Sequence, residues 1–357
     1  MKNFERQLEI IKKFDINGNV TDIDNCGDGH INSTFLAITD AGEKYLLQKI
    51  NTNVFTNPAH VMENIMNVTS FLKEKGEETL NVVSTLTGEL MAWQGDDCYR
   101  VYNYIEDTIT YQIAENTQVF KNAGEAFGNF QKTLSSFDAE SLHEIIADFH
   151  NTPVRYNNFC ASVDKNLSGR LDECLDEVKF VKERCDTYGK IVDGIKRGDI
   201  PLRVTHNDTK LNNVLMDAVT KKSRAVIDLD TVMPGSMLYD FGDAIRFGAS
   251  TAAEDEQNLD KVHFDINMFR AYAQGFCGAL KGAITDEEAK LLPYSAYLMT
   301  MECGMRFLAD FIDGDTYFST KYPDHNLVRC RTQLRLAEEM ERCMEEMQSI
   351  IDECIGA

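Results

Sequence analysis

The chain has 357 residues, of which 43% are hydrophobic and 26% charged, as is ordinary for a globular protein with a substantial core. Its formal net charge is −22, from 36 basic and 58 acidic residues, so it lacks the excess of Lys and Arg that binding to nucleic acid or to an anionic membrane requires. We interpret the acidity as a source of solubility, because the charge is spread along the chain; attraction of a cationic substrate is the alternative.

The cysteines and the N-terminus indicate the compartment. None of the ten cysteines forms a C-x-x-C pair or clusters with histidine, which excludes an obvious zinc or iron–sulfur site. A chain of this size without closely paired cysteines is typical of a reducing compartment. The N-terminus lacks the apolar core of a signal peptide, and no apolar run approaches the length of a membrane span. We therefore expect a cytoplasmic protein. We also expect it to be a monomer.

The first third of the chain predicts short strands and a helix. Residues 3–14 carry apolar side chains at helical spacing. A strand begins at Val20, and a turn with Gly27 and Gly29 precedes His30 and Asn32. Two glycines between strands let the backbone approach a phosphate closely, and the Asn can donate to it. A plain hairpin fits the same pattern, so the order of this turn, well ahead of the motif below, is what favours nucleotide binding.

The next strand, at 44–50, departs from the pattern of many kinases. In those proteins this strand carries a Lys for the α- and β-phosphates. Register places Gln48 at that position and turns Lys49 to the opposite face. A helix is expected at 61–75, followed by strands at 82–86, 90–93 and 98–104.

A change from strand to helix periodicity marks the expected boundary between lobes. Tyr104 and Ile105 form the predicted hinge, where backbone amides hold adenine. We therefore predict a nucleotide-binding lobe over residues 1–105 and a catalytic and substrate-binding lobe over 106–357.

Most of this second lobe predicts helices. Pro153 predicts the end of a helix at 149–153, and further helices are expected at 159–196 and from 266 onward, with an acidic final helix at 337–353. His150 is interpreted as structural rather than as a substrate contact. Arg306 lies among apolar residues, so it is either paired structurally or directed into a pocket.

Between these helices, residues 204–215 place His206, Asp208, Lys210 and Asn213 at relative positions one, three, five and eight. This order is typical of a phosphoryl-transfer loop. Asp208 would accept the proton of an attacking hydroxyl, Lys210 would neutralise charge on the moving phosphoryl group, and Asn213 would bind Mg²⁺. The octet alone also fits a polar surface loop.

The residues after the loop strengthen the kinase interpretation. Two short apolar segments around a turn at 218–223 predict a hairpin that returns Asp228 beside Asn213. Two oxygen ligands at the mouth of one hairpin suit Mg²⁺, which keeps its other positions for phosphate and water. Asp240 occurs in an Asp-Phe-Gly sequence but lies too far along the chain for a metal ligand. We interpret it as a helix cap or as a carboxylate that braces residues 241–247.

Together, His206-Asn207-Asp208, Asn213 and Ile227-Asp228-Leu229-Asp230 resemble the aminoglycoside phosphotransferase and choline kinase superfamily. The chain is more similar still to the N-acetylhexosamine 1-kinases of that superfamily, over essentially its whole length, with shared strings at 27–32, 149–150, 202–213, 228–230, 233–238, 301–310 and 321–323.

This resemblance implies an α+β, protein-kinase-like bilobal fold with a small N-terminal antiparallel sheet lobe and a larger, mainly helical C-terminal lobe. It implies ATP- and Mg²⁺-dependent phosphorylation of the anomeric C1 hydroxyl of N-acetylglucosamine or N-acetylgalactosamine. It assigns the base to Asp208 and the metal to Asn213 and Asp228. The residues it assigns to the sugar site are Lys210, Arg306 and Tyr317, with Asp230 and His30 as further candidates.

Two alternatives stay open. A kinase of the same superfamily for homoserine, choline or an aminoglycoside would show carboxylates facing the acceptor pocket. A nucleotide-binding pseudokinase is supported only by Gln48, since Asp208, Asn213 and Asp228 form a complete set. A protein acceptor is disfavoured, because the stretch between Asp228 and Asp240 is too short for a long activation segment.

Overall fold

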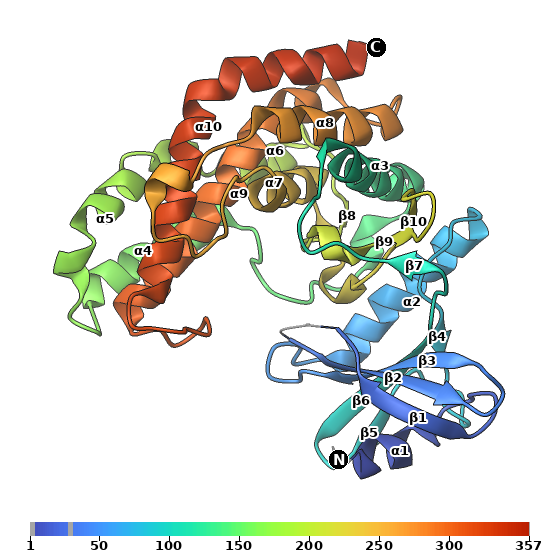
Figure 1. The fold of residues 1–357 in the computed structure, drawn as a ribbon. Helices are drawn as coiled ribbons and strands as arrows, with labels where there is room; N and C mark the ends of the chain where they lie inside the picture. Colours follow the sequence, from blue (N-terminus) through green and yellow to red (C-terminus); the bar gives the residue numbers. More distant parts are fainter. Residues whose placement is uncertain (1–3, 28–30, 357) are drawn as a thin grey trace.

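The N-terminal part of the chain forms a small antiparallel sheet. A computed structural model describes residues 4–27 and 31–356, and Figure 1 shows the sheet lobe below the helical remainder. The strand order is β1-β2-β3-β6-β4, with β5 paired to β6. The elements are α1 (Glu5–Ile11), β1 (Val20–Asn25), β2 (Ser33–Thr39), β3 (Lys44–Ile50), α2 (Pro58–Glu74), β4 (Val82–Val83), β5 (Ala92–Gln94) and β6 (Asp97–Asn103).

Alternation along β6 separates the two faces of this sheet. Tyr99 and Val101 join a core with α1, whereas Cys98 and Tyr102 join the larger core shared with α2 and the helical lobe. Arg100 belongs to the second row, because successive side chains of a strand point to opposite faces. A fully buried arginine, 1% exposed, thus faces α2.

Helix α2 is held against the helical lobe by one buried amide. The side chain of Asn64 donates to the carbonyl oxygens of His143 at 2.8 Å and of Val232 at 2.9 Å, and it accepts the His143 amide at 2.9 Å. Glu63 contacts the His143 ring rather than β3. The helix is therefore fixed to both lobes without the strand-to-helix ion pair of protein kinases.

The chain passes into the helical lobe at residues 104–107. The Tyr104 amide donates to the Lys44 carbonyl at 3.1 Å, and Lys44 Nζ lies 2.9 Å from Glu106 Oε2. Strand β7 (Thr108–Ile109) then pairs with β9 (Val214–Asp217). This pairing places the connection between the two lobes beside the hairpin that follows residues 206–213.

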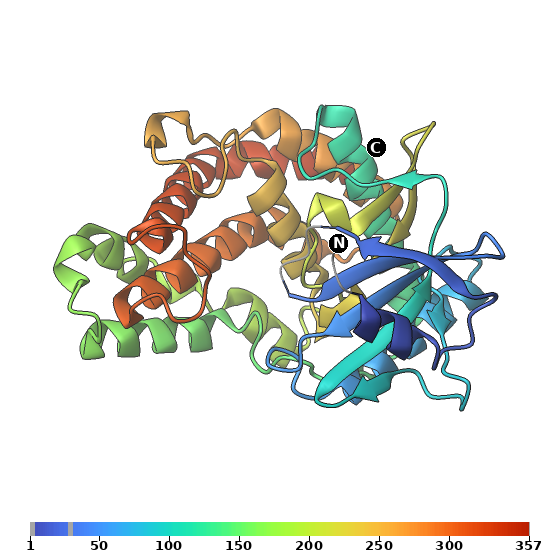
Figure 2. The ribbon, with the colours of Figure 1, turned by 60° about the horizontal axis from the view of Figure 1, so that its bottom comes forward.

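The larger lobe is mainly helical, and its long helices pack closely (Figures 1 and 2). A Cβ atom on Gly124 would lie 2.4 Å from the Tyr272 carbonyl oxygen, so the close approach of α3 and α8 requires glycine there. The helices are α3 (Thr117–Thr133), α4 (Thr152–Lys165), α5 (Leu175–Lys182), α6 (Lys190–Arg197), α7 (Met237–Gly248), α8 (Ile266–Ala279), α9 (Asp286–Asp313) and α10 (His325–Gly356). The remaining strands are β8 (Arg203–Thr205), β10 (Ser223–Val226) and β11 (Met233–Gly235).

Several helix boundaries differ from the sequence prediction, and two of them have a clear cause. Pro153 begins α4 rather than ending a helix: Asn151 is the N-cap, and the missing amide of a proline in the first turn costs no helical hydrogen bond. The last helix is also longer than 337–353, because its buried apolar residues start at Leu327, ahead of the acidic stretch.

Two further observations concern the cysteines and the length of apolar helices. All ten cysteines are free thiols. Over residues 4–27 and 31–356, no helix combines the length and the apolar character needed to cross a membrane.

Candidate active site

The loop after β8 is rigidly braced from behind. Asp240, at the start of α7, accepts the backbone amides of His206 at 3.0 Å and Asn207 at 2.8 Å, and its carbonyl accepts the Thr209 hydroxyl at 2.7 Å. His206 is buried, and its Nε2 lies 2.9 Å from the Ile227 carbonyl oxygen. Asp240 was predicted to cap a helix or to brace residues 241–247. Instead it braces the loop at 206–209, and Ser236 is the N-cap of α7. His206 is structural as well, since it joins the loop to the end of the hairpin.

Asp208 stands at the front of this loop with a cation and an amide. Its carboxylate is 26% exposed, and Lys210 Nζ lies 2.9 Å from Oδ1. The Asn213 amide nitrogen donates to the Asp208 carbonyl at 2.8 Å and to Oδ2 at 3.2 Å. Burial alone would lower the pKa of Lys210, but Asp208 reverses the effect and raises it. Lys210 therefore stays charged at neutral pH.

The predicted hairpin brings Asp228 back to Asn213. Strands β9 and β10 are antiparallel, with a register shift between Ser223 and Ala225, and the Ile227 amide donates to the Asn213 carbonyl at 2.9 Å. Asp228 adopts a left-handed backbone with φ of 60°, which turns its carboxylate out of the strand direction. Asp228 as a residue keeps solvent exposure, while neighbouring protein groups crowd its carboxylate.

Several carboxylates lie close together around Asp228, as is expected of a site that binds a cation. Burial raises the pKa of Asp228 to about 6, Asp230 and Asp208 add to the rise, and His206 and Arg100 oppose it. A divalent cation would relieve this crowding. Because the Asn213 nitrogen is used by Asp208, the Asn213 side-chain oxygen remains for a metal.

These two side chains fit Mg²⁺ only together with other ligands. In the described part of the chain, no group of three or more His, Cys, Asp or Glu side chains is placed to hold a metal ion. Mg²⁺ is commonly held by one or two protein groups, with phosphate and water completing its shell. The pair Asn213 and Asp228 therefore suits a metal that arrives with a nucleotide.

Gln48 occupies the position where many kinases carry the strand lysine, and Arg100 contacts it from the neighbouring strand. The sequence did not predict this contact. Gln48 and Arg100 are cross-strand partners on β3 and β6, and the Gln48 oxygen accepts Arg100 Nε at 3.0 Å and Nη2 at 2.8 Å. Arg100 Nη2 also lies 2.6 Å from Asp230 Oδ1. Lys49, as predicted, turns away, with its Nζ 2.6 Å from Asp97 Oδ1.

Asp230 is bound by Asn32, at the start of the described chain after residues 28–30. Its carboxylate is 3% exposed, and Oδ2 accepts the Asn32 amide at 2.6 Å. In this structure Asp230 and Asn32, predicted to contact substrate and nucleotide, therefore bind each other. Gly27 has a left-handed φ of 77° that favours glycine. Gly29 and His30 lie outside the described residues.

Arg306 lies among aromatic side chains, away from the catalytic loop in sequence. On α9, its guanidinium carbon lies 5.9, 5.8 and 5.5 Å from the ring centres of Phe149, Tyr317 and Phe318. Among residues 4–27 and 31–356, it makes no hydrogen bond or ion pair. A half-buried guanidinium with unused donors is suited to bind an acceptor molecule.

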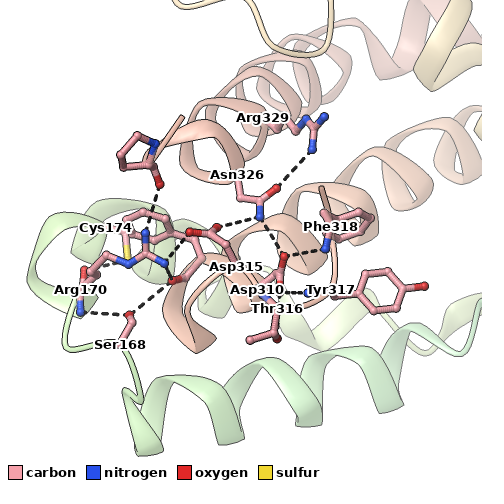
Figure 3. A network of polar contacts seen from close by, with 12 residues as sticks. Ser168, Arg170, Cys174, Asp310, Asp315, Thr316, Tyr317, Phe318, Asn326 and Arg329 are labelled. Carbon is pink, nitrogen blue, oxygen red and sulfur yellow. Dashed lines mark hydrogen bonds and ion pairs between the residues drawn. The ribbon is translucent and has the colours of Figure 1, made fainter. Parts of the chain in front are cut away.

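The loop that carries Tyr317 is held by a buried carboxylate. Asp310 accepts the backbone amides of Thr316 and Tyr317 at 2.8 Å and of Phe318 at 2.9 Å. Asn326 links Asp310 to Asp315, with 2.8 Å to each. Figure 3 shows this network behind the loop, with the Tyr317 ring pointing away from it. Tyr317, 70% exposed, is thus presented by a fixed backbone.

His150 belongs to the support of this region. Its Nδ1 lies 2.9 Å from Glu302 Oε1, and the Thr152 hydroxyl donates to the other oxygen. Burial would raise the pKa of Glu302, but His150, Thr152 and Arg306 lower it. The preferred interpretation of His150 as a structural residue agrees with this contact.

Comparison with known proteins identifies the family. Residues 22–274 match the model of the phosphotransferase enzyme family known as APH. The chain belongs to this family. It is a phosphotransferase, and the resemblance to the aminoglycoside phosphotransferase superfamily is confirmed at that level.

Solved structures of other APH-like kinases show the same bilobal fold. A microcompartment-associated aminopropanol kinase has 14% identity and a TM-score of 0.63 over 97% of this chain and 99% of its own. An amicoumacin kinase, solved with AMP-PNP, Ca²⁺ and its ligand, has 12% identity and a TM-score of 0.60 over 96% and 94%. Spectinomycin phosphotransferase, solved with ADP and spectinomycin, has 12% identity and a TM-score of 0.60 over 96% and 98%.

Proposed function

We propose that this APH-family protein is an ATP-dependent kinase that phosphorylates the C1 hydroxyl of N-acetylhexosamines to give the sugar 1-phosphate. The observation that carries the acceptor class is Arg306, whose unused donors lie beside three aromatic rings. Sugars bind through flat aromatic contact and through donors to their hydroxyl and amide oxygens. The sequence resemblance to N-acetylhexosamine 1-kinases selects the position of transfer.

In the proposed mechanism, Asp208 orients the attacking hydroxyl and takes its proton as the γ-phosphoryl group moves. Lys210, 2.9 Å from Asp208, is placed to offset the negative charge that spreads over the phosphoryl oxygens. Asn213 and Asp228 would hold Mg²⁺, which supplies charge neutralisation at the phosphates when bound. The nucleotide and divalent cation named for the amicoumacin kinase support this cofactor proposal.

We also propose that the two lobes have different roles. Residues 1–105 hold the nucleotide through the glycine turn around Gly27, through Gln48 and through the backbone of Tyr104 and Ile105. Residues 106–357 supply the catalytic loop and the acceptor site. The pairing of β7 with β9 supports this assignment, because adenine bound at Tyr104 and Ile105 would then lie near the catalytic hairpin.

A kinase for an amine or amino alcohol is the second candidate. The net charge of −22 and the substrates named for the solved relatives favour it. Such a site needs carboxylates free to hold an ammonium group. Here Asp243 accepts Arg246 at 3.0 and 2.9 Å, and Glu302 is bound by His150 and Thr152. Both carboxylates already have protein partners, so we favour the sugar acceptor.

The test is ADP release with Mg-ATP across a panel of acceptors. The panel holds N-acetylglucosamine, N-acetylgalactosamine, glucose, homoserine, choline and kanamycin, with the Asp208→Asn variant as the blank. We expect turnover confined to the N-acetyl sugars. Turnover on an amine alone would keep the catalytic loop and overturn the sugar assignment of Arg306 and Tyr317.

Replacing Arg306 by Ala is expected to raise KM for the acceptor by about ten- to a hundredfold, because charge-assisted hydrogen bonds to the acceptor are lost. The KM for ATP should stay within about twofold. Arg306→Lys should fall between, since lysine keeps the charge but lacks the planar fork. Arg342→Ala, an exposed change on α10, is the matched control. An unchanged acceptor KM in Arg306→Ala would remove Arg306 from the acceptor site.

A further inference from the structure

The nucleotide side of the cleft poses a charge problem. A triphosphate carries several negative charges, and kinases of this general fold neutralise part of them with a lysine on the strand equivalent to β3. Gln48 stands at this position and is neutral. The neighbouring lysines are engaged elsewhere, with Lys44 on Glu106 and Lys49 on Asp97.

Arg100 extends from the adjacent strand β6 to Gln48, the position of the strand lysine in other kinases. It is the direct cross-strand partner of Gln48, and the Gln48 oxygen accepts two of its N–H groups. Its third contact is Asp230 at 2.6 Å, two residues beyond the proposed metal ligand Asp228. The guanidinium therefore lies between Gln48 on β3 and Asp230, which follows the hairpin of the proposed metal ligands.

Arg100 also has donors to spare. Its Nη1 meets only the Met62 sulfur, at 3.9 Å, among the described residues. A thioether is a weak acceptor, so this nitrogen is left poorly satisfied in a buried site. Phosphate oxygens are stronger acceptors and suit the fixed fork of a guanidinium.

The partners of Arg100 explain how a buried cation is tolerated without nucleotide. Asp230 supplies the counter-charge, and Gln48 fixes the orientation of the fork. Burial would lower the pKa of Arg100, but Asp230 more than offsets this and raises it, so the group stays charged. A buried charge without such a partner would be strongly destabilising.

We propose that Arg100 is the cation that binds the phosphates of ATP, with Gln48 and Asp230 as its positioning residues. The trio takes over the role of the strand lysine and its helix glutamate, and Asp230 thereby belongs to the nucleotide side of the cleft. This inference rests on the proposed use of ATP but not on the identity of the acceptor.

The test measures nucleotide affinity by calorimetry in the absence of any acceptor, with ATP, ADP and adenosine, in Mg²⁺ and in EDTA. Arg100→Gln is expected to weaken ATP by about ten- to a hundredfold and adenosine by less than about twofold. The double variant Gln48→Lys with Arg100→Gln returns the charge to β3. It should recover at least about tenfold in ATP affinity over Arg100→Gln.

A purely structural role for Arg100 must be separable from phosphate binding. Arg100→Gln leaves Asp230 unpaired and can destabilise the fold, so Arg100→Gln with Asp230→Asn removes both charges together. We expect this pair to keep the wild-type thermal midpoint and still bind ATP poorly. Equal weakening of ATP and adenosine, or unchanged ATP affinity in both variants, would overturn the proposal. Because no acceptor is present, failure of the sugar assignment would leave these results intact.

Discussion

The Asp208→Asn variant is expected to lose about 10²- to 10⁴-fold in kcat while KM for ATP changes little. Asparagine keeps the size of the side chain and can still accept from Asn213, but it cannot take a proton from the acceptor hydroxyl. The magnitude is that of a lost general base. Steady-state ADP release with N-acetylglucosamine as acceptor measures it.

The fold should survive this change, because Asp208 is partly exposed and the loop is held by Asp240 and His206 instead. Asp164→Asn, an exposed change on α4, is the matched control and should retain full turnover. Near-wild-type turnover in Asp208→Asn with an intact fold would remove Asp208 as the base.

The second large effect is expected at Asp228. Asp228→Asn should lower kcat/KM for Mg-ATP by about a thousandfold, because the metal loses its charged ligand and with it several kcal/mol of transition-state stabilisation. Asn213→Ala should lose less, since it removes a neutral ligand. Titration of activity with Mg²⁺ should show the apparent metal affinity falling in both variants.

The stability of Asp228→Asn separates a metal ligand from a structural carboxylate. The folded protein disfavours the charge at this position, because burial and two neighbouring carboxylates raise the pKa of Asp228 to about 6. At pH 7.5 its removal should therefore leave Tm unchanged or higher. Asparagine also tolerates the left-handed backbone at φ of 60°. A lower Tm together with normal Mg²⁺ dependence would contradict the assignment.

The local sequence predicted the arrangement of the catalytic loop and of the hairpin that follows it. The spacing of Asp208 and Asn213, and the single hairpin that returns Asp228, are short-range features whose geometry follows from turn and strand rules. Asp240 was predicted to brace residues 241–247, whereas it accepts the His206 and Asn207 amides, a contact between distant residues that local sequence does not reveal.

The nucleotide side depended on long-range pairing that a single sequence does not reveal. Arg100 contacts Gln48 because β3 and β6 are neighbours in the sheet. It contacts Asp230 because the two lobes touch at this point. One local signal was available: an arginine in an otherwise apolar, aromatic strand must be paired. The error at Pro153 had a local cause, since the same residue stops one helix and starts another.

The most direct test of the proposed reaction compares N-acetylglucosamine with its methyl 1-glycoside as acceptors. Both sugars offer the same ring, N-acetyl group and remaining hydroxyls, but the glycoside has no free C1 hydroxyl. ADP release and phosphorus NMR of the product would be followed with Mg-ATP. We predict sugar 1-phosphate from the free sugar and no turnover with the glycoside. Comparable phosphorylation of the glycoside would contradict transfer to C1.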